Sequence, residues 1–333
     1  MTPAHAATGR PVSGSVLLST GYYQPDRVLT NHQLAELVDT SDEWIRSRVG
    51  IEQRRIASDD QTVADMATQA GTRVLANAEV PPDAVELVVV ATTTAEVASP
   101  PTAFQVAARL GIPSPVGYDV NTACSGFGHA LLLADAMIRA GVGRTALVLA
   151  AEKLSAVADW SDRRTCVLVG DGAAGMLLRA AEDGERPSIL SGLAGSAPDL
   201  GHTVVIDGSP PRFHQDGQAV YRWAVTELPE LARRACRAGG LEPDELAGFV
   251  PHQANLRIIE PLAKKLGLAA DAVVATDVRV SGNTSAASVP LAYAKLVEAK
   301  TFAPGSPVLL FGFGGGLAYA GQVVLTPEPS AQG

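Results

Sequence analysis

Three side chains that can take part in acyl-group chemistry occupy similar places in this 333-residue sequence: Cys124, His252 and Asn283. Each comes just after a short apolar run, as in YDVNTACSGFG and FVPHQANLRI. Glycine and other small residues flank Cys124 and Asn283, which lets a substrate come close to them. A cysteine, a histidine and an asparagine together can serve as nucleophile, proton carrier and oxyanion donor.

Cys124 also precedes a helical pattern, so we expect it at a helix N-terminus. Unpaired backbone N–H groups and partial positive charge there favour a thiolate and lower the thiol pKa from about 8.5. A nucleophilic cysteine at this position would have a lowered pKa. A small buried residue in a tight strand–helix junction fits the same pattern, so position alone leaves both interpretations open.

His252 can bond or carry a proton near neutral pH. The side-chain N–H group of Asn283 can donate to a developing oxyanion. A loop histidine or an asparagine that only caps the next helix fits the same local patterns. The two residues gain significance only if the fold brings them to Cys124.

The remaining cysteines and the nearest histidine are predicted to be structural. Cys166 and Cys236 lie inside apolar patterns. His129 follows Cys124 by five residues, which is about 140° around a helix at about 100° per residue. We expect His129 to face away from the cysteine and to pack.

The glycine run GFGGG at residues 312–316 could suggest a dinucleotide site. That site requires a helix after the glycines, whereas LAYAGQVVL is typical of a strand. Glycines between strands let backbone N–H groups reach a ligand, as an oxyanion hole requires. A plain hairpin turn is the alternative.

The elements that position these residues follow an α/β pattern. Short β-branched or apolar runs at 85–94, 145–152 and 307–314 predict strands buried on both faces. Residues 125–141 predict a mostly buried helix. Strands that alternate with helices indicate an α/β fold.

A weak internal repeat relates the two halves of the chain. PDAVELVVVATTT, YDVNTACSGFG and GRTALVLAAE recur in the same order as PDELAGFVPHQAN, TDVRVSGNTSAA and GSPVLLFGFGGG. We predict a flexible arm at residues 1–12 and two related halves at 13–183 and 184–333, packed with pseudo-twofold symmetry. Corresponding loops would then meet, and ligands gather at the carboxyl ends of strands in such sheets. The repeat therefore predicts that Cys124, His252 and Asn283 converge.

Composition narrows the function classes. A net charge of −9 and a pI of about 5.2 argue against general nucleic-acid binding. No apolar stretch reaches the roughly 18 residues of a membrane span, and the N-terminus has no apolar signal core. Three cysteines give neither a disulfide framework nor a paired metal motif. We expect a cytoplasmic protein with no metal and no membrane partner.

Several long motifs resemble the β-ketoacyl-acyl-carrier-protein synthase III family, of the thiolase fold. They are TSDEWIRSRVGI at 40–51, the cysteine loop around Cys124, VGDG at 169–172, VPHQANLRII at 250–259 and GNTSAASVP at 282–290. The resemblance covers nearly the whole chain after Gly14. It implies a layered αβαβα arrangement and a homodimer.

The resemblance also implies an activity. Cys124 would take an acyl group from an acyl-CoA primer, with backbone N–H groups of Cys124 and Gly315 as an oxyanion hole. His252 and Asn283 would then stabilise the enolate that malonyl-acyl carrier protein forms when it loses carbon dioxide. No cofactor beyond the CoA thioester substrate is expected.

By the same resemblance, three sets of residues contact the substrates. Trp44, Arg48 and Arg163 are expected at CoA, and Ser99, Gln215 and Phe313 at the acyl pocket. The carrier protein is expected to dock on the basic residues Arg222, Arg257, Lys264 and Lys265.

Departures from the family pattern point to a specialised primer. Ser99 stands where phenylalanine is common, and Gln215 stands where methionine is usual. Initiation of polyketide synthesis is one such setting. Three alternatives remain: an acyltransferase of the same fold, a non-catalytic acyl-binding subunit, and a relative of 3-hydroxy-3-methylglutaryl-CoA synthase. The last uses a glutamate base where Thr93 stands here, and Glu96 does not align with it.

Overall fold

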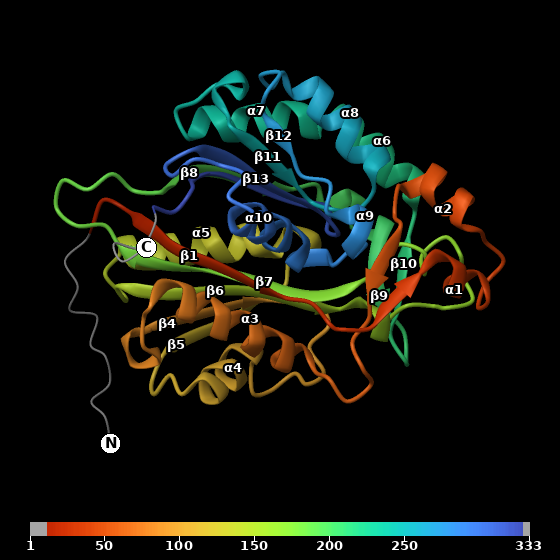
Figure 1. Ribbon diagram of the computed structural model, residues 1–333, viewed down its shortest axis with the longest axis horizontal. Helices are drawn as coiled ribbons and strands as arrows, with labels where there is room; N and C mark the ends of the chain where they lie inside the picture. The colour runs from red at the N-terminus through yellow and green to blue at the C-terminus, as the bar shows by residue number, and fades with distance from the viewer. Residues whose placement is uncertain (1–11, 329–333) are drawn as a thin grey trace.

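A computed structural model describes residues 12–328 and shows a five-layer α/β molecule. Two five-stranded sheets enclose a central pair of helices, and further helices cover the outer face of each sheet (Figure 1). The layered fold predicted from the sequence is confirmed. Residues 1–11 of the predicted arm lie outside the described part of the chain.

The first sheet has the strand order β1-β7-β6-β4-β5. Its strands are β1 (Ser15–Tyr23), β4 (Leu87–Ala91), β5 (Val116–Val120), β6 (Thr145–Lys153) and β7 (Asp171–Ala180). β4 pairs in parallel with β5 and β6, whereas β7 pairs antiparallel with β6 and β1. All five residues of β4 are buried, as its continuous apolar sequence predicts.

The second sheet repeats this arrangement. Its order is β12-β11-β13-β14-β8, and the parallel and antiparallel pairs occupy corresponding places. Its strands are β8 (Ile189–Ser196), β11 (Gly248–Pro251), β12 (Val273–Val274), β13 (Pro307–Gly314) and β14 (Ala318–Leu325). β7 ends at Ala180 and β8 begins at Ile189. The division of the chain at residues 183 and 184 stays a prediction.

The central layer consists of α5 (Gly126–Arg139) and α10 (Ser288–Glu298). Both helices lie between the sheets, so both are apolar around most of their circumference. Phe127, Leu131 and Tyr293 belong to one buried cluster that includes strand residues of both sheets. This shared core holds the loops at the N-termini of the two helices close together.

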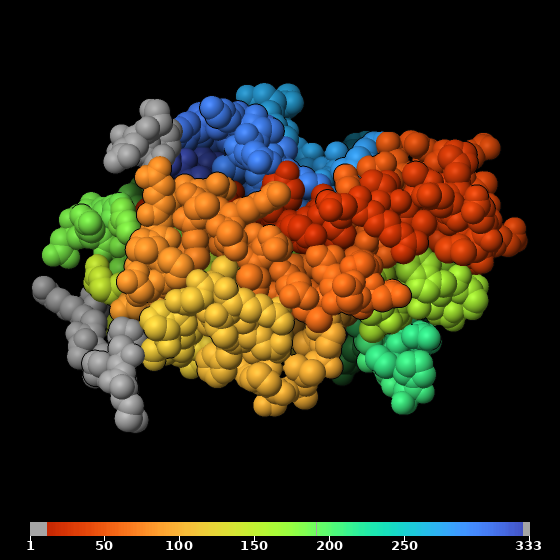
Figure 2. Space-filling model, turned by 60° about the horizontal axis from the view of Figure 1, so that its bottom comes forward, coloured from red at the N-terminus to blue at the C-terminus, as the bar shows by residue number. Residues whose placement is uncertain are grey.

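The outer layers are helical. α3 (Val63–Ala78) and α4 (Thr102–Leu110) cover the first sheet, and Figure 2 shows this face as the orange to yellow surface. On the second sheet lie α6 (Gly217–Thr226), α7 (Leu228–Ala238) and α8 (Leu256–Leu266). Thr62 and Asp65 form a capping box that begins α3.

Smaller elements surround one end of the sheets. Two antiparallel strand pairs form there, β2 (Val28–Thr30) with β3 (Gln53–Arg55) and β9 (Val204–Asp207) with β10 (Arg212–Gln215). The short helices are α1 (Asn31–Ala35), α2 (Asp42–Val49) and α9 (Val278–Ser281). The 3₁₀ segments are η1 (Pro82–Ala84), η2 (Ala123–Ser125), η3 (Leu154–Ala156), η4 (Pro198–Thr203), η5 (Pro243–Glu245) and η6 (Ser285–Ala287).

Candidate active site

The cysteine loop and its counterpart in the second half share one backbone conformation. NTAC at 121–124 aligns with NTSA at 283–286, and each continues through a 3₁₀ turn into a central helix. Ala123 and Ser285, the third residues of these motifs, both have φ of 46°. This left-handed conformation is uncommon for residues other than glycine. The repeat therefore places Asn283 at the position that Asn121 holds in the first half.

The β13 strand approaches the cysteine without room for a side chain. A Cβ atom added to Gly314 would lie 2.9 Å from the Sγ atom of Cys124. A Cβ atom added to Gly312 would lie 2.9 Å from the Cα atom of Ser125. These glycines let the backbone of β13 reach the nucleophile, as expected from the run at 312–316. β14 follows them as the predicted strand, so the dinucleotide interpretation is excluded.

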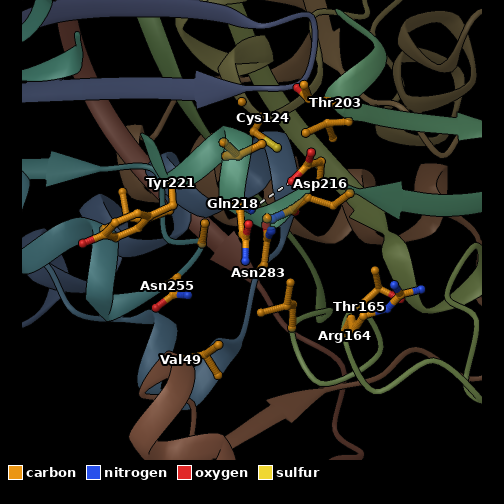
Figure 3. Close-up of a pocket in the computed structure, with 18 of the residues that line it drawn as sticks. Val49, Cys124, Arg164, Thr165, Thr203, Asp216, Gln218, Tyr221, Asn255 and Asn283 are labelled. Carbon is orange, nitrogen blue, oxygen red and sulfur yellow. Dashed lines mark hydrogen bonds between the residues drawn. The ribbon is translucent and has the colours of Figure 1, made fainter. Parts of the chain in front are cut away.

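Two cavities meet at Cys124. The larger has a volume of about 1240 Å³, and the smaller about 300 Å³. Cys124, Asn283 and Gly315 line both, whereas His252 lines the larger. Figure 3 shows Cys124 and Asn283 in the larger cavity. The predicted convergence of the three residues on one place is therefore observed.

His252 follows β11 and is 2% exposed. Its Nδ1 atom lies 2.7 Å from the Oγ atom of Ser288, which also accepts a hydrogen bond from the backbone N–H of Gln253. When the Ser288 hydroxyl donates to Nδ1, the ring carries its proton on Nε2. The ring packs edge-on against Phe313 at 5.4 Å between centroids. Burial lowers the pKa of His252 to about 3, so the ring is neutral and acts as an N–H donor.

Asn283 is held by hydrogen bonds on three sides. Its Oδ1 atom accepts from the backbone N–H of Ser285 at 2.8 Å, its own N–H donates to Leu168, and its carbonyl accepts from Gly170. Because Oδ1 is engaged, the amide N–H₂ group is the free end of the side chain. Asn283 thus does two things. Its Oδ1 atom stabilises the local turn, as expected of a capping asparagine, and its N–H₂ group is a donor that faces the cavity.

The predicted low pKa of Cys124 is wrong. Burial raises the pKa of the thiol to about 11, well above the ordinary pKa of a cysteine. The sulfur lies in a 3₁₀ turn ahead of α5 and is 9% exposed. The cost of removing a thiolate from water here exceeds the helix-terminus effect. The resting nucleophile is therefore a thiol that must lose its proton on attack.

Residues 118–196 match the family 3-Oxoacyl-[acyl-carrier-protein (ACP)] synthase III, and residues 236–326 match its C-terminal family. Beta-ketoacyl-[acyl-carrier-protein] synthase III 2 of Streptomyces avermitilis is 59% identical over 316 residues, or 95% of this chain and 100% of that protein. Synthase III 4 of Streptomyces coelicolor is 58% identical over 314 residues, or 94% and 99% of the two chains. The chain belongs to the 3-oxoacyl-[acyl-carrier-protein] synthase III family.

The solved structure of the priming β-ketosynthase from the R1128 polyketide biosynthetic pathway is also similar to this synthase III. It gives a TM-score of 0.92 at 38% identity and covers 96% of this chain and 98% of that chain. The thiolase-like fold and the assignment to an acyl-transferring condensing enzyme are thereby confirmed.

Residues of this synthase III expected at CoA lie around the mouth of the larger cavity. Trp44 and Arg48, on α2, line it. The guanidinium of Arg163 lies 5.3 Å from the Trp44 ring centroid and donates to Asp39. Arg163 is absent from the cavity lining, where its neighbour Arg164 is found instead.

The four basic residues expected at the carrier protein are exposed. Arg222 on α6 and Arg257 on α8 also line the larger cavity. Lys264 and Lys265 lie in the last turn of α8, and Lys265 donates to the Val225 carbonyl. The patch therefore borders the entrance through which a carrier-bound substrate would reach Cys124.

The residues expected at the acyl pocket separate into two groups. Gln215 and Phe313 line the larger cavity, and Ser99 lies on an exposed loop and lines neither cavity. The smaller cavity is bounded mainly by other residues that sequence reasoning missed: Thr93, Leu154, Val204, Ile206 and Phe213. The alternating apolar pattern of TVVIDGSPPRFHQ, split by Gly-Ser-Pro-Pro, was the available signal for the β9–β10 hairpin.

The residues predicted to be structural lie outside both cavities. Cys166 and Cys236 are buried in separate apolar clusters. The Nδ1 atom of His129 lies 3.1 Å from both the Thr122 hydroxyl and the Ser125 carbonyl. His129 thus stabilises the cysteine loop through polar contacts with Thr122 and Ser125, in addition to packing.

Residues 12–328 contain no group of three or more His, Cys, Asp and Glu side chains placed to hold a metal ion. None of the helices described there has the length and apolar character needed to cross a membrane.

Proposed function

We propose that this synthase III condenses an acyl-CoA primer with malonyl-acyl carrier protein through an acyl-Cys124 intermediate. The observation that carries the proposal is the position of Cys124, where a large cavity meets a small one. His252 and Asn283 offer two neutral N–H donors to the larger cavity at the same place. No step requires a cofactor beyond the two thioesters.

In the first half-reaction, acyl-CoA binds with its nucleotide near Trp44 and Arg48. An adenine ring stacked on Trp44 would take the place that the Arg163 guanidinium now occupies. The thiol of Cys124 attacks the thioester carbonyl, and backbone N–H groups of Cys124 and Gly315 stabilise the oxyanion. CoA leaves, and the acyl chain remains in the smaller cavity.

In the second half-reaction, the malonyl thioester carbonyl accepts hydrogen bonds from Nε2 of His252 and the amide of Asn283. These donors stabilise the enolate oxygen when the malonyl carboxylate leaves as carbon dioxide. The enolate carbon attacks the acyl-Cys124 carbonyl and releases the cysteine. A neutral imidazole suits this role, because it can donate from Nε2 without adding a charge to a buried site.

Docking of the carrier protein at Arg222, Arg257, Lys264 and Lys265 is part of the proposal. Acyl carrier proteins are acidic, so local charge complementarity would guide the encounter although the whole enzyme is acidic. The position of Arg222 and Arg257 at the cavity mouth supports this site.

The primer is proposed to be a specialised acyl group of modest size, as used when polyketide or fatty-acid synthesis begins. The smaller cavity, at about 300 Å³, lies at the lower end of the roughly 300–1,000 Å³ range of ligand pockets. Leu154, Val204, Ile206 and Phe213 make its walls mainly apolar. These features favour a short or branched apolar chain.

A homodimer that joins the free edges of two β5 strands is proposed. Among residues 12–328, β5 pairs only with β4, and the residues of β5 are partly or fully exposed. Val97, Phe104 and Tyr118 are each 45–47% exposed near this edge. An exposed edge strand with large apolar neighbours is a surface that another copy can cover. The loop with Ser99 would then face the partner's acyl pocket. A cytoplasmic location stays a prediction.

Simple acyl transfer is the alternative. It needs Cys124 and its oxyanion hole, but it gives the paired donors on His252 and Asn283 no enolate to stabilise. The 3-hydroxy-3-methylglutaryl-CoA synthase interpretation is less well supported, because Glu96 is exposed and accepts from the Val63 backbone. A non-catalytic subunit would have no use for this site.

The test is intact-protein mass spectrometry with a panel of acyl-CoA primers, followed by measurement of carbon dioxide release from malonyl-acyl carrier protein. We expect a mass increase equal to one acyl group in the wild type and none in Cys124→Ala. Acylation without carbon dioxide release and chain extension would favour acyl transfer instead. Condensation that survives in Cys124→Ala would refute the assigned nucleophile.

A further inference from the structure

Arg54 is a fully buried arginine that the reaction described above does not use. It is the middle residue of β3 and is 0% exposed, whereas its neighbours Gln53 and Arg55 are partly exposed. Burial lowers the pKa of Arg54 to about 10, so the guanidinium is still charged at neutral pH. Within residues 12–328, its Nε atom has no hydrogen-bond partner. A buried charge is costly unless it is well bonded, so its presence at this position requires a reason.

The two terminal nitrogens of the Arg54 guanidinium bond in different directions. Nη1 donates to Oδ1 of Asn31 at 2.7 Å and to the Leu29 carbonyl at 3.3 Å. Nη2 donates to the Val167 carbonyl at 2.8 Å, which lies 113 residues further along the chain. Arg54 therefore joins the β2–β3 pair to the segment that begins at Val167.

This segment also holds the backbone of Asn283. The N–H of Asn283 donates to the Leu168 carbonyl at 2.7 Å, and the Asn283 carbonyl accepts from the N–H of Gly170 at 2.9 Å. Val169 and Asn283 thus form a parallel bridge. Because Nη2 of Arg54 bonds the residue just before Leu168, the guanidinium fixes one side of this bridge.

The stem of Arg54 lies against the same bridge. A Cβ atom added to Gly282, which precedes Asn283, would lie 3.1 Å from the Cβ atom of Arg54. A Cβ atom added to Gly170 would lie 3.4 Å from that atom. Both segments of the bridge therefore pass close to Arg54 at a glycine, so Arg54 packs against both segments and bonds one of them.

The other side of the guanidinium leads to α2, which carries Trp44 at the cavity mouth. Asn31 is 1% exposed, and its Nδ2 atom donates to Oδ1 of Asp42, the first residue of α2, at 2.8 Å. The same atom donates to the carbonyl of Ile51, just beyond the end of α2, at 2.8 Å. Since Nη1 of Arg54 bonds Oδ1 of Asn31, both ends of α2 are joined to Arg54 through one amide.

We propose that Arg54 is a positioning residue that sets two parts of the site together: the Asn283 amide for decarboxylation, and α2 for binding of acyl-CoA. This inference rests on the proposed role of Asn283 as a donor to the enolate oxygen. The side chain of Asn283 is bonded to its own turn at Ser285, so its direction follows from the position of its backbone. A planar guanidinium can hold acceptors on two sides in fixed directions, which an ammonium group cannot.

The chain offers variants that separate the two parts. Arg54→Lys keeps the charge but loses the planar fork. Arg54→Met keeps most of the stem and removes every donor. Asn31→Ala removes the bonds to α2 and leaves the bond from Nη2 in place. Arg55→Lys is the matched control, because Arg55 is the next residue of β3, donates to two backbone carbonyls just before β2, and lines neither cavity.

The experiment measures three quantities for each variant. They are the KM for acyl-CoA, the rate of Cys124 acylation at saturating acyl-CoA, and the single-turnover rate of carbon dioxide release when acylated enzyme is mixed with malonyl-acyl carrier protein. In Arg54→Lys we expect carbon dioxide release to slow about 100-fold, as for a group displaced by about 1 Å, and the KM for acyl-CoA to rise severalfold. Acylation at saturation stays at the wild-type rate, because that step does not use Asn283.

The other variants should divide these effects. Asn31→Ala should raise the KM for acyl-CoA and leave carbon dioxide release at the wild-type rate. Arg55→Lys should match the wild type in all three quantities. A general weakening of the structure would instead slow acylation and carbon dioxide release together. Equal slowing of both steps in Arg54→Lys, or slow carbon dioxide release in Asn31→Ala, would therefore overturn the proposal.

A double variant tests whether Arg54 acts through Asn283. Asn283→Ala alone should slow carbon dioxide release, and adding Arg54→Lys should slow it no further, because residues that act through one group are not additive. A further loss in the double variant would overturn the positioning role, as would a wild-type rate of carbon dioxide release in Arg54→Lys alone.

Failure of the proposed function gives a different result. Unchanged carbon dioxide release in Asn283→Ala would refute the role of Asn283 and the inference that rests on it. Melting temperatures check that each variant is folded, and Arg54→Met replaces Arg54→Lys if the lysine variant does not fold. If neither folds, Asn31→Ala decides, since an unchanged KM for acyl-CoA there would overturn the joint positioning of α2 and Asn283.

Discussion

At the scale of single residues, the site relies on groups kept neutral by burial. The His252 ring is neutral because its pKa is lowered to about 3, and the Cys124 thiol is neutral because its pKa is raised to about 11. Two neutral donors and a protonated nucleophile avoid a charge that would have to be paired in this apolar setting. Charge then develops only during reaction.

Burial of neutral His252 predicts an acid-sensitive fold. An unfolded histidine titrates near 6.5, so between pH 6.5 and 3 the unfolded chain binds a proton that the folded chain does not. The free energy of unfolding from this site is fully present above pH 6.5 and falls as pH drops, by about 2 kcal/mol at pH 5. Urea unfolding at pH 7 and pH 5 should show this difference in the wild type.

His252→Asn should lose less stability than the wild type between those two pH values. His32→Asn, which changes an exposed histidine, is the control. An equal pH effect in His252→Asn and wild type would mean that another group causes the acid sensitivity.

At the scale of elements, short segments from both halves bring substrate-binding groups to the cysteine. α2 carries Trp44 at the cavity mouth, and its start is fixed by Ser41, whose side chain accepts from the Trp44 backbone N–H. β13 brings glycines against the nucleophile, and the β9–β10 hairpin closes the smaller cavity.

Trp44→Ala should weaken binding of acyl-CoA without slowing the chemical step. Loss of one aromatic surface for a base typically costs about 1–3 kcal/mol, so we expect KM for acyl-CoA to rise about tenfold. The acylation rate at saturation should stay the same, and Trp44→Phe should recover most of the affinity. An unchanged KM in Trp44→Ala would place the nucleotide elsewhere.

Gly314→Ala should misplace the nucleophile. The new methyl group would overlap Cys124 Sγ, and a displacement of about 1 Å can reduce a rate by roughly 100-fold. Gly172→Ala is the control, since a Cβ atom there has no neighbour closer than 3.4 Å. Stopped-flow measurement of the acylation rate would check this. Equal rates for both variants would contradict the close approach of Gly314 to Cys124.

Sequence reasoning predicted the elements better than the local electrostatics. Continuous apolar runs identified the central strands. The repeat predicted that Cys124 and Asn283 meet, because they lie in corresponding loops of the two halves. The smaller cavity was missed because much of its wall comes from the β9–β10 hairpin, which lies outside the motifs that identified the site. The raised thiol pKa was missed because burial depends on packing that a helix-terminus argument does not include.

At the scale of the whole molecule, the exposed β5 edge predicts association of two 34.4 kDa chains. Tyr118→Asp places a charge on this edge and should convert the dimer to a monomer in light scattering. Leu37→Asp, at an apolar side chain that is 59% exposed elsewhere, should leave it unchanged. A wild type that is monomeric at micromolar concentration would refute the proposed interface.

The paired turns at Ala123 and Ser285 have a consequence for how the two halves differ. Because the two backbones match, the two turns differ in their side chains: Cys124 carries a thiol where its counterpart, Ala286, carries a methyl group. One turn therefore carries the acyl group, while the other contributes an amide and a hydroxyl and holds no competing sulfur. A nearly symmetric scaffold has become a directional site, with a single attachment point and supporting groups opposite it.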